Sequence, residues 1–278
     1  MLRVTDVEYK ECLLNLLNRV HSVCVANNIR YTVCYGTLLG AVRHHGFIPW
    51  DDDIDICMPF EDYPKFVENF ISNDGRYYIL DSNKSKNYYN GFSRVCDGRL
   101  ILKMHDLPDI ENLGAFIDVF LLYKWPEDVN EREKIRAEYL KLEKNVKRAL
   151  PLYIYKTLSW RGKLRLCLTI YRWFYNNVIV GLESRKRERD LFHLKYAKKN
   201  TGWHGVFFLK DAWFIKDDEL DKRILMDFEN IKVYGPANYT QLLVNCYGDY
   251  MKLPPIEHRK SKHHFVPYWK DGKVDNDV

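Results

Sequence analysis

Four aspartates occupy positions 51 to 55, and they follow the pair Gly36-Thr37 by about fifteen residues. In an extended strand alternate side chains point to opposite faces, so Asp51, Asp53 and Asp55 would share one face and Asp52 would point to the other. Like charges on one face repel unless a cation neutralises them, and hard carboxylate oxygens suit Mg2+ or Mn2+. The pattern predicts a divalent metal site that serves phosphoryl or nucleotidyl transfer.

The acidic run has three other interpretations, namely a solvated loop, a calcium-binding loop and a structural metal site. An EF-hand loop starting at Asp51 needs glycine at its sixth position, where this sequence has Ile56. A solvated loop fits poorly because apolar residues such as Trp50, Ile54 and Met58 interleave with the acids. We therefore expect a metal site, whose ligands would be Asp51, Asp53 and Asp55.

Asp118 is the best candidate for a further metal ligand or a catalytic group. It is the only acid in the apolar strand expected over residues 115–122, and a lone buried acid needs a partner. A second metal bound by Asp118 would complete a two-metal clamp for displacement at phosphorus. The alternative is an aspartate at a strand end that accepts hydrogen bonds from the backbone.

Gly36 lies between an expected strand and an expected helix. A glycine there would let backbone N–H groups and the helix N-terminus face an anion, and the Thr37 hydroxyl would add a donor. A simple helix-capping turn is the alternative. Arg43 follows by two helical turns, and it could bind a phosphate bidentately or form a salt bridge with the acidic run.

An aromatic and basic segment runs from Tyr247 to His264 and includes Arg259. Its positive charges could neutralise the phosphates of a substrate. The alternative is a helix end, a Pro-Pro stop and a solvated tail.

The overall composition is that of a globular protein. The 278 residues are 46% hydrophobic and 15% aromatic, enough for a sizeable core. The net charge of +5 is too small to indicate nucleic-acid binding, and we expect none. The seven cysteines have no CxxC spacing, so we expect a reducing, cytoplasmic environment and no zinc site. Neither a signal-peptide pattern nor an uncharged apolar window of about 18 residues is present.

The elements that must position these residues follow from hydrophobic spacing. Apolar residues predict an amphipathic helix over 8–28, a buried strand over 29–35 and a short helix over 37–44 with Thr37 near its cap. The acidic strand follows, and Asp62 would cap the next helix. The remaining strands are expected at 77–81, 100–104, 115–122, 206–208, 212–215 and 224–233, with a helix from Pro236 to Cys246. Residues 1–124 therefore have the pattern of an α/β or α+β fold.

Composition changes at Pro126. We expect a catalytic core at 1–125, a helical insert at 126–200, and a C-terminal part at 201–278 that completes the catalytic domain. Within the insert, residues 152–189 mix apolar residues with lysine and arginine, which suits an anionic membrane face. A helix packed on the main domain with a solvated polar side is the alternative.

Three segments together resemble the LicD family, whose members transfer phosphocholine to bacterial surface glycans and which is related to fukutin-type enzymes. They are YGTLLGAVRHHGFIPWDDDIDICM, FIDVFLL, and YGDYMKLPP with the trailing HRKSKHH. The resemblance is close over 10–70, good over 114–122 and 238–264, and weak or absent over 126–200. It implies an α+β fold with a nucleotidyltransferase-like mixed sheet flanked by helices, carrying Gly36-Thr37 and Asp53-Ile54-Asp55.

The resemblance also implies an activity, which is transfer of phosphocholine from CDP-choline to a hydroxyl of a teichoic-acid or lipopolysaccharide precursor, with release of CMP. Asp53, Asp55 and Asp118 would be catalytic, Mg2+ or Mn2+ the cofactor, and a lipid-linked glycan the acceptor. The protein would be cytoplasmic or peripheral on the inner face of the membrane. Attack would fall on the phosphorus distal to the nucleoside.

Other functions remain open at this point. One is transfer of ribitol or glycerol phosphate from the corresponding CDP donor. Another is a nucleotidyltransferase that moves NMP from an NTP to a small hydroxylated acceptor and releases pyrophosphate. A protein that binds glycans or membranes without catalysis is disfavoured because every acid of the motif is present.

Overall fold

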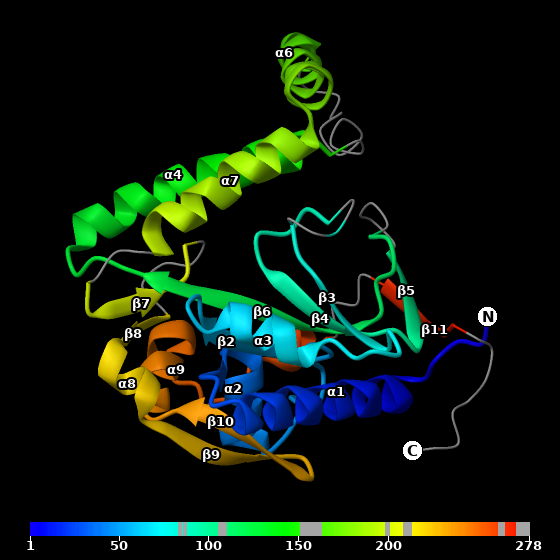
Figure 1. The fold of residues 1–278 in the computed structure, drawn as a ribbon, viewed down its shortest axis with the longest axis vertical. Coiled ribbons are helices and arrows are strands. Elements are labelled where there is room, and N and C mark those ends of the chain that lie inside the picture. Colours follow the sequence, from blue (N-terminus) through cyan, green and yellow to red (C-terminus); the bar gives the residue numbers. More distant parts are fainter. Residues whose placement is uncertain are drawn as a thin grey trace.

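The computed structural model describes residues 1–82, 85, 88–104, 110–150, 163–197, 201–207, 213–260 and 265–270. A mixed sheet forms the centre of the molecule, helices pack around it, and a helical pair extends above one end of the sheet (Figure 1). The predicted α+β class with a mixed sheet and a helical insert is confirmed.

The central sheet has the order β1-β2-β6-β4-β3, with β7 and β8 continuing from β6. Strands β2 and β6 are parallel, and the other neighbouring strands in this sheet are antiparallel. The strands are β1 (Thr32–Val33), β2 (Asp55–Pro59), β3 (Tyr77–Leu80), β4 (Ser93–Asp97), β6 (Ala115–Lys124), β7 (Trp203–Gly205) and β8 (Phe214–Lys216). Two separate ribbons pair β5 (Leu100–Met104) with β11 (Phe265–Trp269), and β9 (Arg223–Phe228) with β10 (Ile231–Pro236).

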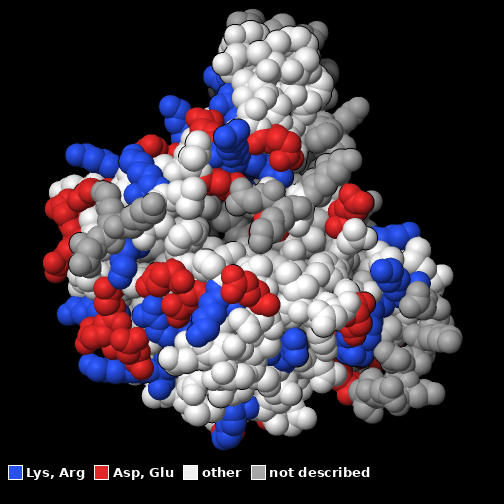
Figure 2. Space-filling model, viewed as in Figure 1, with Lys and Arg blue, Asp and Glu red and all other residues white. Residues whose placement is uncertain are grey.

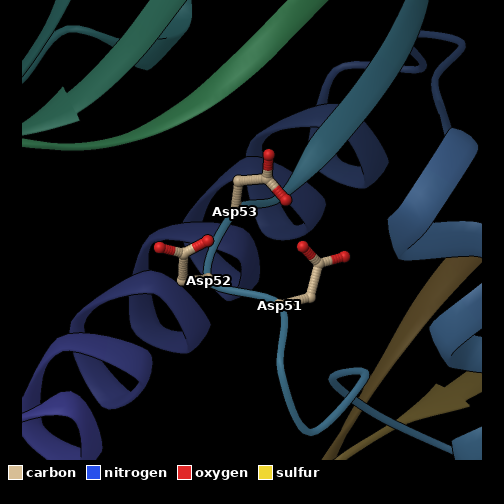
Figure 3. Close-up of side chains that lie close together, drawn as sticks. All are labelled: Asp51, Asp52 and Asp53. Carbon is tan, nitrogen blue, oxygen red and sulfur yellow. The ribbon is translucent and has the colours of Figure 1, made fainter. Parts of the chain in front are cut away.

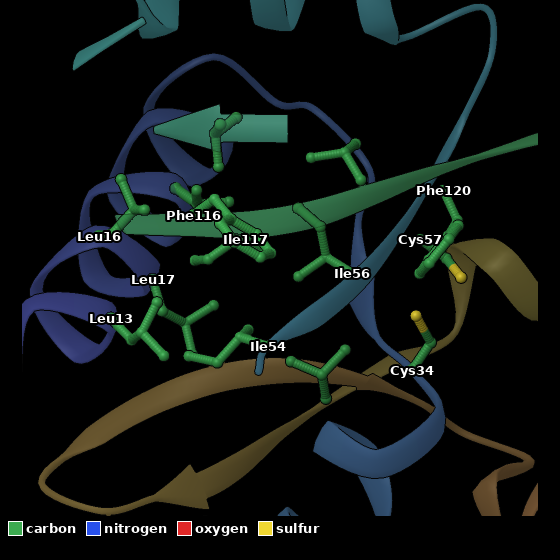
Figure 4. Packing of buried hydrophobic residues seen from close by; sticks show 14 of the residues in the cluster. Leu13, Leu16, Leu17, Cys34, Ile54, Ile56, Cys57, Phe116, Ile117 and Phe120 are labelled. Carbon is green, nitrogen blue, oxygen red and sulfur yellow. The ribbon is translucent and has the colours of Figure 1, made fainter. Parts of the chain in front are cut away.

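Helix α1 (Asp6–Ala26) packs its apolar face against the sheet. Its first turn is closed by a capping box, in which the Thr5 and Glu8 side chains satisfy each other's backbone N–H groups. Leu13 and Leu17 are fully buried and face Ile54 and Ile117 in the core (Figure 4). The core therefore lies directly beneath the strands that carry the acidic residues.

Two helix starts differ from the predictions. Helix α2 (Tyr35–His44) begins two residues before Thr37, and α9 (Tyr239–Tyr247) begins three residues after Pro236, which instead ends β10. Helix α3 (Tyr63–Phe70) begins where expected, but the Asp62 side chain makes no capping bond. Its carboxylate accepts a hydrogen bond of 2.9 Å from Nε of Arg30, so a tertiary ion pair replaces the predicted cap.

The strand predictions were wrong in two places that matter for the site. The acidic strand begins only at Asp55, because residues 51 to 54 run in an irregular loop toward β2. Strand β4 was missed, although it lies between β6 and β3 in the sheet. The expected strands at 206–208 and 212–215 fall partly outside the described residues.

The segment expected to be a helical insert is helical where the structure describes it. It contains α4 (Val129–Arg148), α6 (Lys163–Phe174), the π-helix η1 (Tyr175–Val180) and α7 (Leu182–Ala197), followed after β8 by the short α8 (Asp217–Asp221). Helices α4 and α7 pack on each other, and an aromatic cluster joins them to the end of β6. Among the described residues, no helix is long and apolar enough to cross a bilayer.

Candidate active site

Three adjacent strands bring two acids and one arginine side by side. Asp55 of β2 pairs in register with Asp118 of β6, and Asp118 pairs in register with Arg94 of β4. Residues directly opposite each other in a sheet project from the same face. Nε of Arg94 donates to Oδ1 of Asp118 at 2.7 Å, and the guanidinium lies 3.8 Å from the ring centroid of Phe116.

This ion pair is what the strand pattern did not reveal. Asp118 is only 9% exposed, and its buried partner is a side chain rather than the backbone. The alternative of a strand-end aspartate bonded to backbone is therefore replaced by a mid-strand aspartate paired with Arg94. A charged residue inside the run Phe92-Ser93-Arg94-Val95-Cys96 was the sequence signal that could have suggested a strand with an internal partner.

The loop before β2 gathers the other acids. Carboxylate oxygens of Asp51, Asp52 and Asp53 lie within 4.8 Å of one another (Figure 3). The expectation that Asp52 points away is wrong, because strand alternation does not apply to an irregular loop. Asp52 lines the same cleft as its neighbours and as Asp55 and Asp118.

Helix α2 positions this loop through two residues. The Thr37 hydroxyl accepts a hydrogen bond of 2.8 Å from the Asp55 backbone N–H, which ties the first turn of α2 to the start of β2. Gly36 lines the cleft, and a Cβ at that position would stand 2.8 Å from Oδ2 of Asp51. Thr37 is buried, so its hydroxyl supports Asp55 while Gly36 leaves room for Asp51.

The acids raise one another's pKa values. Burial raises the pKa of Asp53 to about 8, and the charges of Asp51 and Asp118 add to the effect. Burial, followed by the charges of Asp53 and Asp118, raises the pKa of Asp55 well above its usual range. Burial also raises the pKa of Asp118, whereas the charge of Arg94 and its hydrogen bond to Asp118 lower that pKa. So many carboxylates in one cleft are stable in their ionised form only beside a compensating cation.

The acids form the floor of a cleft of 1070 Å³, and basic residues line its rim together with Asp249. Arg43, at the end of α2, lines the cleft and donates from Nη1 to the Tyr250 carbonyl at 2.7 Å. Its Nε contacts Nε2 of His44 at 3.0 Å. Arg43 therefore fastens the segment after α9 to α2, and its described partners are not the acidic run.

The C-terminal segment contributes the rest of the rim. Tyr247, Lys252, His258 and Lys260 line the cleft. Arg259, which was predicted to bind substrate, is not among the lining residues. It donates to the Pro254 carbonyl at 2.8 Å and lies over the Trp50 ring at 5.5 Å. The predicted His264 lies outside the described residues.

The residues of the floor fit a divalent cation. Their donor set consists of carboxylate oxygens, which are the ligands that Mg2+ and Mn2+ prefer. Asp51, Asp52 and Asp53 supply one close group of oxygens, and Asp55 and Asp118 lie on neighbouring strands of the same cleft. The cation would relieve the repulsion that raises the carboxyl pKa values.

Comparisons with known proteins cover both the cleft and the rest of the chain. Residues 28–131 match the family profile described as LicD/FKTN/FKRP, nucleotidyltransferase domain. The lipopolysaccharide cholinephosphotransferase LicD of Haemophilus influenzae is 29% identical over 274 residues, which cover 95% of this chain and 97% of that protein. An uncharacterized protein of Rickettsia typhi is 52% identical over 56 residues, or 20% of this chain and 18% of that protein. An uncharacterized protein of Rickettsia prowazekii is 52% identical over 50 residues, or 18% of this chain and 19% of that protein.

Proposed function

Because this chain belongs to the LicD family through the domain at residues 28–131, we propose that it transfers phosphocholine to a hydroxyl of a surface glycan. Family membership makes it a transferase. The proposed donor is CDP-choline and the proposed acceptor is a lipid-linked precursor of lipopolysaccharide or teichoic acid. The products would be the phosphocholine-bearing glycan and CMP.

The observation that carries the proposal is the cleft with an acidic floor and a basic rim. A diphosphate donor has negative charge along its length, so it needs cations on more than one side. Arg43, Lys252 and Lys260 supply positive charge at the rim, and a divalent ion held by the acids would supply it at the floor. The N-terminal end of α2, where Gly36 lines the cleft, favours an anion as well, because the helix dipole places partial positive charge there.

The floor residues have distinct proposed roles. Asp51, Asp53 and Asp55 would hold Mg2+ or Mn2+, which neutralises the charge of the diphosphate when bound. Asp118 would hold a second ion or take the proton from the acceptor hydroxyl, with Arg94 fixing the direction of its carboxylate. The hydroxyl oxygen forms a bond to the phosphorus of phosphocholine, and the bond to the CMP oxygen breaks with its electron pair leaving on CMP.

The test is a product analysis with purified protein, Mg2+ and a lipopolysaccharide or teichoic-acid acceptor. Separate reactions receive CDP-choline, CDP-ribitol, CDP-glycerol and a mixture of NTPs. We expect CMP and a choline-labelled glycan from CDP-choline. CMP from only CDP-ribitol or CDP-glycerol would contradict the donor, and pyrophosphate from an NTP would contradict the reaction type.

A matched pair of variants shows whether the cleft is responsible. Asp53→Asn removes one floor carboxylate, whereas Asp227→Asn removes an exposed aspartate that pairs with Lys232. Turnover should be lost in the first variant and kept in the second. Equal turnover in both would exclude the cleft as the reacting site.

A further inference from the structure

The helix α6 and the π-helix η1 expose an unusually large set of apolar side chains. Seven of them are between 43% and 64% exposed, and together they are called the α6–η1 surface. They are Leu168, Ile170, Tyr171, Phe174, Tyr175, Val178 and Ile179. Single exposed apolar residues are normal on a protein surface, but a contiguous group marks a binding surface.

The α6–η1 surface lies where the molecule extends furthest from the central sheet (Figure 1). Helix α6 runs directly into η1, which packs on α4 and α7. In the space-filling view the described atoms at the tip of this end are mostly white, and blue lysines and arginines lie at its base (Figure 2). The surface is therefore accessible to a large, flat partner.

Polarity within η1 is inverted relative to a water-facing helix. Asn176 is only 5% exposed and donates from Nδ2 to the Arg172 carbonyl, and the neighbouring Asn177 donates to the Ala149 carbonyl at the end of α4. Val178 and Ile179, the next two residues, face outward. The Asn177 amide thus anchors η1 to α4 and the Asn176 amide bonds back within the helix, while aliphatic side chains face the surroundings, an arrangement suited to an apolar environment.

The charge of this segment favours a lipid surface over a second copy of the protein as its binding partner. Residues 163 to 182 contain three basic residues, Lys163, Arg165 and Arg172, and no aspartate or glutamate. Arg172 is exposed beside the apolar side chains. Two copies meeting through this segment would bring like charges together without an acid to pair them. An anionic lipid surface supplies both the apolar layer and the negative charge that the segment lacks.

We infer that the α6–η1 surface docks this protein on an anionic lipid bilayer as a peripheral contact. The apolar side chains enter the boundary between headgroups and acyl chains, and Arg172 pairs with lipid phosphates. This contact is separate from the cleft, so it holds whichever donor the cleft uses.

The test is flotation of the full-length protein with vesicles, without donor or acceptor. Vesicles of phosphatidylcholine alone are compared with vesicles containing phosphatidylglycerol, at low and high salt. We expect binding to the anionic vesicles that weakens at high salt, because ionic attraction is screened. The triple variant Leu168→Gln, Tyr171→Gln, Val178→Gln should bind at least about tenfold more weakly, since burial of apolar side chains in the lipid layer drives the contact.

Matched control variants show whether binding depends on this surface or on exposed apolar and basic residues elsewhere in the protein. Val25, Val129 and Leu225 are 52%, 52% and 56% exposed on other elements, and their joint replacement by Gln should leave binding unchanged. Arg172→Glu should weaken binding to anionic vesicles, whereas Lys222→Glu on α8 should not. Circular dichroism verifies that each variant is folded.

Three outcomes would overturn the inference. They are absence of wild-type binding to anionic vesicles, equal loss in the control triple variant, and a dimer in solution that the Leu168, Tyr171 and Val178 changes dissociate while vesicles are not bound. Because the readout is vesicle binding, a failure of phosphocholine transfer in the assay above leaves this result unaffected, and the two proposals fail separately.

Discussion

Burial raises the pKa of Asp53 to about 8, and the negative charges of Asp51 and Asp118 add to this effect. At the scale of single residues, the cleft floor therefore brings like charges together, and their repulsion lowers the stability of the folded protein. Such a cost is characteristic of functional positions, where pKa values are shifted by burial and by like charges. The roles proposed for single residues can be tested by changes that remove one charge or fill one space.

Replacing Asp53 by Asn should separate activity from stability. We expect turnover to fall at least about 100-fold, because one ligand for the proposed cation is lost. The free energy of unfolding without metal should stay equal or rise by on the order of 1 kcal/mol, about one pKa unit of relieved repulsion. Urea unfolding with and without Mg2+ measures this effect. A strong loss of stability in the metal-free variant would contradict the repulsion argument.

Gly36→Ala tests the close approach of α2 to the acidic loop. The new Cβ would stand 2.8 Å from Oδ2 of Asp51, so the carboxylate must move. We expect weaker Mg2+ binding and about tenfold lower turnover, while the melting temperature changes little because alanine favours a helix. Calorimetric titration with Mg2+ measures the affinity. Gly75→Ala cannot serve as a control for this change, because Gly75 has a φ of +74°, which alanine disfavours. The wild-type protein is therefore the reference.

At the scale of elements, the site depends on contacts between segments distant in the sequence. The Thr37 hydroxyl joins α2 to β2, the Arg94 and Asp118 pair joins β4 to β6, and Arg43 joins α2 to the segment after α9. Each contact fixes one wall of the cleft relative to another. A change that breaks one of them should move the groups proposed to be catalytic, even where the changed residue does not touch them.

Thr37→Val removes the acceptor of the Asp55 backbone N–H and nearly preserves volume. We expect a loss of about 1 to 3 kcal/mol in the free energy of unfolding, because a buried donor is left unsatisfied. Turnover should fall in parallel through a shift of Asp55. Thr37→Ser keeps the hydroxyl and should restore most of both quantities. If the valine and serine variants behave alike, the hydrogen bond has no such role.

At the scale of the whole molecule, an aromatic and polar interface holds the helical insert to the sheet. His193 of α7 stacks on Tyr123 of β6 with centroids 4.9 Å apart and on Phe207 at 5.6 Å. Burial and the nearby Arg189 lower the pKa of His193 from 6.5 to about 3. This histidine is therefore neutral in the folded protein, and its protonation destabilises the interface.

Acid should weaken this interface in a defined pH range. Because the folded pKa of His193 lies below its unfolded value, its contribution to stability is present above about pH 6.5 and is lost as pH falls toward about 3. Each pH unit in that window costs about 1.4 kcal/mol. His193→Phe keeps the stacked ring, and its stability should decline less steeply between pH 6.5 and 4.5. Parallel curves for the variant and the wild type, measured by urea unfolding, would contradict this.

The sequence by itself predicted the cluster of acids and the class of the fold. Four acids interleaved with apolar residues predicted the acidic site, and local periodicity predicted α1, β6 and the helical segment after Pro126. These features depend on neighbours within a few residues, which a sequence displays directly. The family resemblance rested on the same short motifs and was confirmed.

Only the tertiary structure decided which residues meet. Strand register and loop path decide where the Asp52 side chain points, which residue pairs with Asp118 and what the Thr37 hydroxyl contacts. They also decide that Lys252 and Lys260, and not Arg259, line the rim. Register and loop path are set by packing between segments that can be more than 200 residues apart, such as Arg43 of α2 and Tyr250, which are 207 residues apart in the chain. Local periodicity has no information about such pairs, and it does not apply in the irregular loop that carries Asp52.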